Sequence, residues 1–203
     1  GDLKRRISQL RKSAAKGGKR KGPDPFHVPK SGAGQVVLVG APNAGKSSLL
    51  AATTNAPVKV ADYPYTTATP LPGMWEQRDL PIQLVDTPPV IEGQLPPGLM
   101  GTVHAADVIA VVADLAAGPL EQMDTVLALL GERGLVLRSV GRNELDRDDP
   151  HQRSALVVAT KADAAPPGEA ETLRELAGDR LDIVPVSART GAGLEELFEA
   201  LWR

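Results

Sequence analysis

One run in the sequence has the residue types and spacing of a loop that binds phosphate groups, Gly40-Ala41-Pro42-Asn43-Ala44-Gly45-Lys46-Ser47. It follows the apolar stretch 36–39, which predicts a buried strand, and it leads into a predicted helix over 46–53. Glycines let the backbone wrap phosphate oxygens, and N–H groups at a helix start point toward an anion. We expect Lys46 to neutralise phosphate charge and Ser47 to ligate Mg²⁺. The alternative is a glycine-rich turn with no ligand.

A second group of polar residues could recognise a purine base. Thr160-Lys161-Ala162-Asp163 follows the apolar stretch 156–159, and Ser187-Ala188 follows 183–186. The Asp163 carboxylate can accept hydrogen bonds from N1–H and the exocyclic amine of guanine, a donor pair that adenine lacks. The apolar stem of Lys161 can lie on the purine face. The alternative is an ordinary loop after a strand.

A third motif, Asp86-Thr87-Pro88-Pro89, comes directly after the predicted strand 82–85. At this place Asp86 could hold a water molecule bound to Mg²⁺. The alternative is an aspartate that caps a turn or a helix. The three motifs jointly predict Mg²⁺-dependent binding of GTP and GDP.

The elements that must position these motifs alternate between apolar runs and amphipathic segments. Strands are expected at 36–39, 74–78, 82–85, 108–112, 156–159 and 183–186. Helices are expected at 3–16, 46–53, 98–105, 120–132, 169–177 and 193–202, with a long loop at 55–72 and a solvated charged loop at 142–150. This alternation predicts a three-layer α/β fold, in which a mostly parallel sheet carries helices on both faces.

Composition narrows the class of protein further. The 203 residues carry a formal net charge of −2 and include no cysteine, so disulfides and thiolate metal sites are excluded and a reducing, cytoplasmic setting is expected. No apolar run is long enough to span a membrane. Residues 1–22 hold nine Lys or Arg and one Asp, whereas the remainder is acidic. We therefore expect a basic helical leader and linker over 1–30 and one domain over 31–203.

Three interpretations of the basic leader stay open. Its cationic side chains would suit the phosphate backbone of RNA or the ribosome, without readout of DNA sequence and without base stacking, since residues 1–22 include no aromatic residue. The leader could instead be a solvated tail that packs Leu3, Ile7 and Leu10 on the domain. Its amphipathic pattern would also suit a membrane surface, although its apolar face holds only small aliphatic side chains.

The motifs resemble those of the TRAFAC class of P-loop GTPases, and within it the Obg/DRG group (developmentally regulated GTP-binding proteins and bacterial relatives). The resemblance extends over nearly the whole chain. Tyr63-Pro64-Tyr65-Thr66-Thr67 is similar to switch I of that group, and 86–93 is similar to its switch II. The leader and 26–32 are similar to the start of DRG-type proteins.

The resemblance implies a role for each matching residue. Phosphate and guanine contacts would come from Asn43, Ala44, Gly45, Lys46, Ser47, Ser48, Thr160, Lys161, Asp163, Ser187, Ala188 and Arg189. Thr160 replaces the usual asparagine. Mg²⁺ would be held by Ser47, Thr67 and, through water, Asp86, with Thr66 as the second choice for the threonine. Catalysis would depend on Lys46, Thr67, Asp86 and Asn43. Asn43 matches the asparagine of potassium-stimulated members, in which K⁺ supplies charge where an arginine finger otherwise acts.

Three departures from the group's pattern bear on activity. Pro89 stands where the group usually has a glycine whose N–H meets the γ-phosphate, and proline has no N–H to offer. Val90 stands where many GTPases carry a water-orienting glutamine. The group also usually carries an inserted domain, whose insertion point we place at 141–153, and a C-terminal TGS domain; neither is found in this sequence.

The leading hypothesis is a slow, Mg²⁺-dependent GTP hydrolase, stimulated by K⁺ and associated with the ribosome, RNA or regulation. No side chain qualifies as a general base, so catalysis would come from positioning and charge neutralisation. The alternative is a nucleotide-binding RNA or ribosome module with little or no turnover, because of Pro89 and Val90.

Overall fold

The computed structural model describes residues 25–57, 69–91 and 93–202. The expected leader helix at 3–16 and the switch I residues Thr66 and Thr67 therefore lie outside the described residues. Among the helices in the described ranges, none combines the length and the apolar character needed to cross a membrane.

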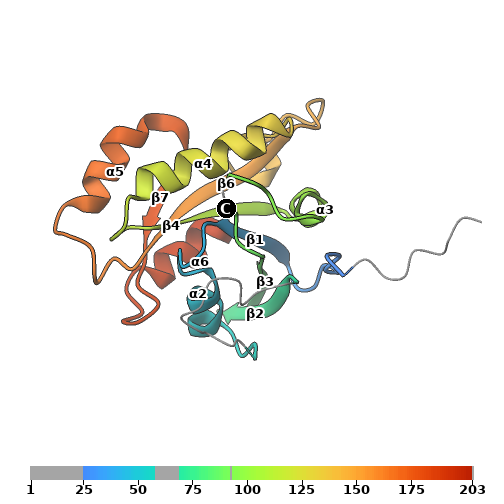
Figure 1. Cartoon of the computed structure of the whole chain (residues 1–203). Helices are drawn as coiled ribbons and strands as arrows, with labels where there is room; N and C mark the ends of the chain where they lie inside the picture. The colour runs from blue at the N-terminus through green and yellow to red at the C-terminus, as the bar shows by residue number, and fades with distance from the viewer. Residues whose placement is uncertain (1–24, 58–68, 92, 203) are drawn as a thin grey trace, which may run out of the picture.

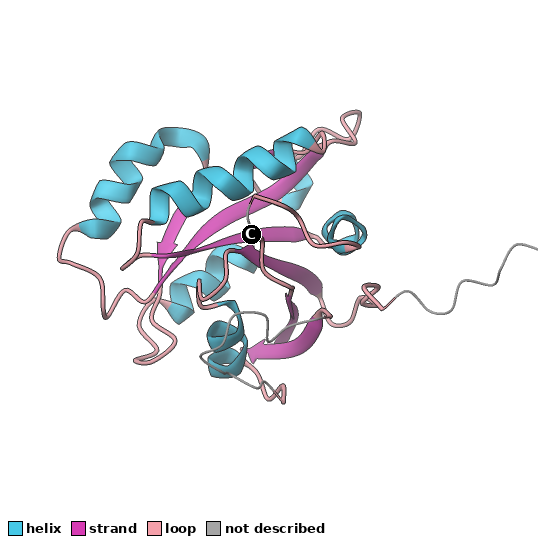
Figure 2. Ribbon diagram, viewed as in Figure 1, coloured by secondary structure: helices cyan, strands magenta, loops and turns pink. Residues whose placement is uncertain are grey.

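A seven-stranded sheet forms the centre of the structure (Figures 1 and 2). Its strands are β1 (Gly34–Gly40), β2 (Leu71–Gln77), β3 (Leu80–Asp86), β4 (Val108–Asp114), β5 (Val136–Arg138), β6 (Gln152–Thr160) and β7 (Ile183–Pro185). The order is β2-β3-β1-β4-β6-β5, and β7 pairs with β6 beyond the short contact with β5. Every pair is parallel except β2 with β3, which are antiparallel.

Helices cover both faces of this sheet. The helices are α2 (Lys46–Thr53), α3 (Leu99–Ala105), α4 (Pro119–Glu132), α5 (Glu169–Ala177) and α6 (Leu194–Trp202), with 3₁₀ turns η1 (Arg142–Glu144) and η2 (Gly178–Arg180). Side chains alternate along β1: Val36 and Leu38 pack in one cluster with α2 and α6, whereas Val37 and Val39 pack in another with α3, α4 and α5. The predicted three-layer α/β architecture is confirmed.

The observed boundaries differ from the predicted ones in a few places. Strand β2 begins at Leu71, inside the expected loop, and β6 begins at Gln152 rather than 156. Strand β5 and the 3₁₀ turns were not predicted. Strand β5 has only three residues, Val136 is 40% exposed, and the apolar run 135–137 is too short to mark a strand. The polar start of β6 pairs with this edge strand, where burial is incomplete.

The segment just before β1 lies against the domain. Thr102 of α3 donates a hydrogen bond to the Phe26 carbonyl over 2.6 Å. The Gln35 side chain donates to the Val28 carbonyl, and the Lys30 ammonium pairs with Asp107. Residues 26–30 are therefore fixed to the edge of the sheet from which the parallel strands start.

Candidate nucleotide-binding site

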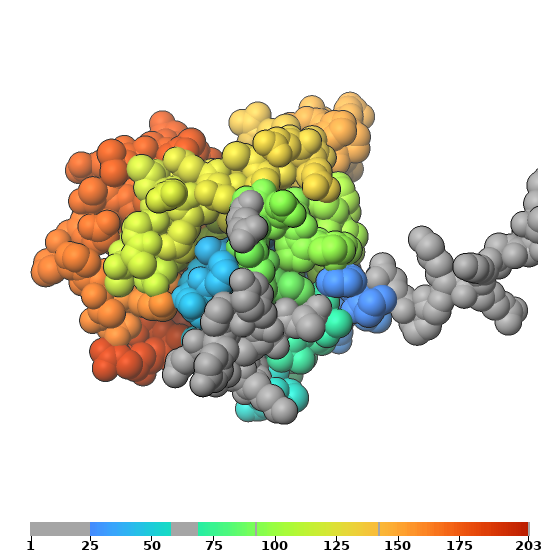
Figure 3. Space-filling model, viewed as in Figure 1, coloured from blue at the N-terminus to red at the C-terminus, as the bar shows by residue number. Residues whose placement is uncertain are grey.

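The predicted motifs meet at the opposite edge, where the parallel strands end. Register explains this placement, because Leu38 of β1 pairs with Asp86 of β3 and Asp114 of β4 pairs with Thr160 of β6. In the space-filling view the light-blue atoms of the loop after β1 lie beside the yellow-green atoms of α4 (Figure 3). Ligands of open α/β sheets bind at this edge.

The loop 40–47 has the tight backbone that phosphate binding requires. Asn43 and Gly45 both have positive φ, of 59° and 94°. A Cβ on Gly40 would lie 2.3 Å from the Val112 carbonyl oxygen, so no larger residue fits there. Gly45 precedes the first residue of α2, and the half-buried Ser47 and Ser48 lie in its first turn. The helix start therefore faces the space enclosed by the loop.

Lys46 is buried across this loop. Its ammonium donates to the carbonyls of Gly40 and Ala41 over 3.0 and 2.8 Å. Burial lowers the pKa of Lys46 from 10.5 to about 8, and the nearby Asp86 carboxylate partly opposes this effect. A phosphate group would offer this ammonium a charged partner in place of the neutral carbonyls.

Ser47 and Asp86 form the part of the site suited to a metal ion. The Ser47 hydroxyl donates to Asp86 Oδ2 over 2.5 Å, and Asp86 is only 1% exposed. Thr87, the next residue, donates to the Leu38 carbonyl and so fixes the end of β3 against β1. A hydroxyl and a carboxylate are hard oxygen donors of the kind that Mg²⁺ prefers, so the residues present fit that ion. Thr67 lies outside the described residues.

Switch II is held to the phosphate loop by its backbone. The Val90 N–H donates to the Gly40 carbonyl over 3.0 Å. The Val90 side chain is 4% exposed and packs in the core cluster with α3 and α4. It therefore does not face the loop, and it could not position a water molecule even if it were polar.

The expected base site lies between the ends of β6 and β7. The Ser187 hydroxyl donates to Asp163 Oδ1 over 2.5 Å, and Arg189 donates to Asp163 Oδ2 through Nε and a terminal nitrogen, each at 2.6 Å. These bonds, that from Ser187 first and those from Arg189 next, hold the pKa of Asp163 below its usual value. The carboxylate thus stays charged, and its remaining lone pairs can still accept. Ala188 is half-buried between its two polar neighbours.

One bond joins the base motif to the phosphate loop. Thr160 is 2% exposed, and its hydroxyl lies 2.5 Å from the Ala44 carbonyl oxygen and 3.1 Å from that of Ala113. A Cβ on Gly45 would approach the same hydroxyl to 3.0 Å. The structure thus brings all the expected site residues that it describes to one edge of the sheet.

Two residues of this edge were not predicted. Asp114 ends β4 and pairs with Lys161, with 2.5 Å between Oδ2 and Nζ. Gln122 of α4 accepts a hydrogen bond from the Asp114 backbone N–H. The sequence carries one signal for Asp114, namely a carboxylate that closes the apolar run 108–113 in the way Asp86 closes its own strand.

A mostly parallel sheet, a phosphate loop after its first strand and a lysine–aspartate motif after β6 define the class of P-loop GTPase domains. Comparison with known proteins narrows this class. The chain belongs to the family of 50S ribosome-binding GTPases, which its residues 35–139 match.

Curated relatives support this membership. The chain is 36% identical over 172 residues to GTPase Obg of Prosthecochloris aestuarii, covering 82% of this chain and 48% of that protein. It is 29% identical over 239 residues to an uncharacterized GTP-binding protein of Halobacterium salinarum, covering 88% of this chain and 64% of that one. The chain thus spans about half the length of the curated relatives it matches.

A solved structure supports the fold. A variant of Era from Aquifex aeolicus superimposes with a TM-score of 0.62 over 85% of this chain and 56% of that one, at 21% identity. At this identity the likeness speaks for the fold alone.

Proposed function

We propose that this chain binds GTP and GDP at the carboxyl edge of its sheet and hydrolyses GTP slowly. The observation that carries the proposal is the Thr160–Ala44 bond, because it joins a base site built on Asp163 to a phosphate loop built on Lys46. Two separate sites would not need such a link. The depressed pKa of Asp163 supports a carboxylate that accepts from guanine at neutral pH.

The chemistry is in-line attack of water on the γ-phosphate. Lys46 would exchange its two carbonyl partners for phosphate oxygens and so neutralise charge as it develops. Ser47, Thr67 and, through water, Asp86 would hold Mg²⁺, which when bound supplies positive charge to the phosphates. Among the residues that surround the described site, none is placed as a general base, so a low rate is expected.

We extend the proposal to K⁺ at Asn43. This residue is exposed in the phosphate loop and has a left-handed backbone. A cation held there would add positive charge beside the phosphates, where the described residues of switch II include no Lys or Arg. Single-turnover GTP hydrolysis should be faster in K⁺ than in Na⁺, and Asn43→Ala should make the two rates equal.

The second candidate function is a nucleotide-binding module for RNA or the ribosome in the cytoplasm. It is favoured by switch II, since Pro89 lacks an N–H and the N–H of Val90 is already bonded to Gly40. Such a switch would respond weakly to the γ-phosphate. The basic residues 1–22 would bind phosphate backbones, with affinity that falls steeply as salt rises.

Asp163→Asn tests the base site directly. An amide donates where the carboxylate accepts, so affinity for GDP should fall by at least about 100-fold while affinity for XDP rises. Asp124→Asn, a change at an exposed ion pair of α4, is the matched control. Unchanged GDP affinity would remove the base site. Phosphate release from GTP under single-turnover conditions then decides between the two candidate functions. Asp86→Ala is the inactive reference: a hydrolase should release phosphate faster than this variant, whereas a binding module should not.

A further inference from the structure

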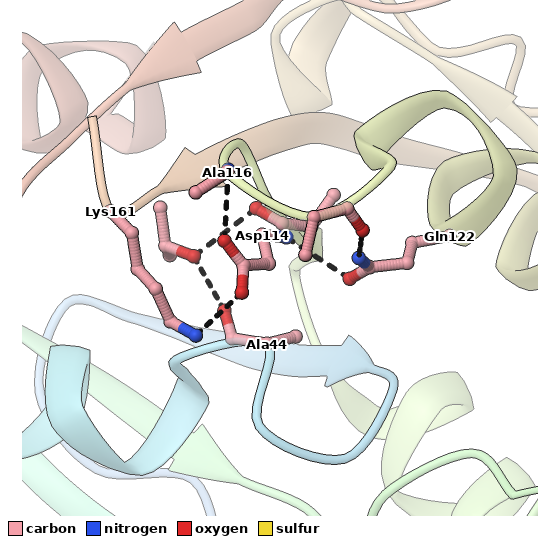
Figure 4. A network of polar contacts seen from close by, with 8 residues as sticks. Ala44, Asp114, Ala116, Gln122 and Lys161 are labelled. Carbon is pink, nitrogen blue, oxygen red and sulfur yellow. Dashed lines mark hydrogen bonds and ion pairs between the residues drawn. The ribbon is translucent and has the colours of Figure 1, made fainter. Parts of the chain in front are cut away.

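The ion pair between Asp114 and Lys161 joins the ends of two neighbouring strands, β4 and β6, near Ala44 of the phosphate loop (Figure 4). Asp114 is the last residue of β4 and lies in register with Thr160, the last residue of β6. The backbone continues this link, because the Leu115 N–H donates to the Thr160 carbonyl over 2.9 Å. The pair therefore lies beside Thr160, whose hydroxyl donates to the Ala44 carbonyl.

The carboxylate of Asp114 is fixed before it meets the lysine. The Asp114 Oδ1 atom accepts from the Ala116 N–H over 2.9 Å, and the backbone N–H of Asp114 donates to Gln122 Oε1 over 3.0 Å. Gln122 also donates to the Ala117 carbonyl, so the turn 114–117 is held from both sides. The Asp114 side chain is only 11% exposed. A carboxylate so enclosed is a rigid acceptor at a set position.

Lys161 is the flexible partner and has an uncommon backbone. Its φ is 58°, in the left-handed region that a long side chain rarely adopts. Its carbonyl accepts from the N–H groups of Ala164 and Ala165, which fixes the backbone but leaves the long stem free to rotate. The side chain remains 41% exposed. The contact between Nζ and Asp114 Oδ2 is what selects one direction for the stem.

We propose that Asp114 is a positioning residue for nucleotide binding: it holds the Lys161 stem where that stem covers the purine, and so slows nucleotide release. The inference rests on the proposed base site. In the absence of the carboxylate the ammonium would be hydrated, and the stem would have to be ordered anew at each binding event. Because the stem packs on a ring face and reads no base edge, Asp114 affects affinity and leaves base preference to Asp163.

Release of a fluorescent GDP analogue measures this role. Asp114→Asn keeps the shape and the acceptor for Ala116 but loses the charge, and it should speed release by about tenfold, the effect of one charge-assisted hydrogen bond. Lys161→Ala should speed release at least as much. In the double variant Asp114→Asn should add less than about twofold, because its action passes through the lysine.

Two matched variants separate positioning from folding. Gln122→Ala loosens the turn 114–117 but keeps the Asp114 carboxylate, so it should speed GDP release less than Asp114→Asn does. Asp124→Asn removes an exposed ion pair of the same 2.5 Å length and should release GDP within about twofold of the parent chain. The preference for GDP over XDP should be unchanged in Asp114→Asn.

Three results would overturn the inference: a normal release rate in Asp114→Asn, an undiminished effect in the Lys161→Ala background, or equal acceleration by Gln122→Ala. These outcomes differ from failure of the proposed function itself. That failure would appear as unchanged base preference in Asp163→Asn, whatever Asp114 does.

Discussion

Ser47 and Asp86 are 39 positions apart in the chain, yet the serine hydroxyl donates to the aspartate carboxylate over 2.5 Å. The contact follows from the sheet, since β1 and β3 are parallel neighbours and both end at this edge. The two oxygen atoms proposed to hold Mg²⁺ are thus already in contact without the ion.

Ser47→Ala should weaken the dependence of GTP binding on Mg²⁺, because it removes a ligand and leaves Asp86 to hold water alone. We expect at least about a tenfold loss of Mg²⁺ affinity, measured by GTP titration with the metal and with chelator. Thr172→Ala, which removes an exposed hydroxyl on α5 away from the site, is the control. Equal Mg²⁺ dependence in Ser47→Ala and in the parent chain would contradict the assignment.

Nucleotide affinity should fall as pH rises above about 8, the pKa to which burial lowers Lys46. Bound phosphate favours the ammonium and raises that pKa, so binding above this pH takes up a proton and weakens about tenfold per pH unit. Titration of GDP and of guanosine at several pH values separates this effect from ionisation of the base, since guanosine does not meet Lys46. Parallel pH profiles for the two ligands would count against the role of Lys46.

The same lowered pKa predicts the opposite trend for the nucleotide-free fold. The unfolded chain binds a proton at Lys46 up to pH 10.5, whereas the folded chain releases it from about pH 8, so this group stabilises the fold increasingly as pH rises through that window. Urea unfolding of the free protein at pH 7.5 and 9.5 measures the sum over all groups. Lys46→Met is the control, and its pH slope over this window should be less positive.

Arg189→Ala should raise the pKa of Asp163 toward its ordinary value, because one of the two groups that stabilise the charged form is removed. Ser187→Ala should shift this pKa in the same direction, since the Ser187 hydrogen bond is the largest single cause of its lowering. Carbon NMR of the Asp163 carboxyl during acid titration reports it directly. Arg180→Ala, which breaks a remote pair with Asp124, should leave that titration unchanged.

Phe198→Ala should destabilise the domain by about 3–5 kcal/mol, because it removes a buried ring and leaves a cavity. The ring meets Trp75 edge-on, with centroids 5.1 Å apart, and Phe198 is 3% exposed. Trp202→Ala on the same helix should cost less than about 1 kcal/mol, because Trp202 is 47% exposed. Urea unfolding of both variants measures the two losses of unfolding free energy. Equal losses would contradict the assignment of Phe198 as the residue that anchors α6 to the core.

The sequence was sufficient for the architecture because its strands are buried on both faces. Short continuous apolar runs such as Val36–Val39, each followed by a turn, are typical of strands buried on both faces. The short strand β5 escaped prediction because it is an edge strand whose residues are partly exposed. Its existence depends on pairing with β6, a long-range contact that no local pattern records.

The expected site residues could be predicted from motif spacing, whereas the residues that hold them in place could not. Nothing in the spacing says that Asp114 would be the partner of Lys161, because the two are 47 positions apart and meet only when β4 and β6 are in register. Likewise, the Val90 backbone bond to Gly40 depends on how the end of β3 turns back over β1. Such contacts are properties of the assembled sheet.

Thr160 has one hydroxyl proton and two carbonyl oxygens within reach, at Ala44 and at Ala113. A hydroxyl can give its proton to only one of them at a time, and the shorter distance favours Ala44. The hydrogen bond between the base motif and the phosphate loop therefore uses a single proton. An asparagine amide would offer two such protons, so in this chain fewer hydrogen bonds connect the end of β6 to the phosphate loop.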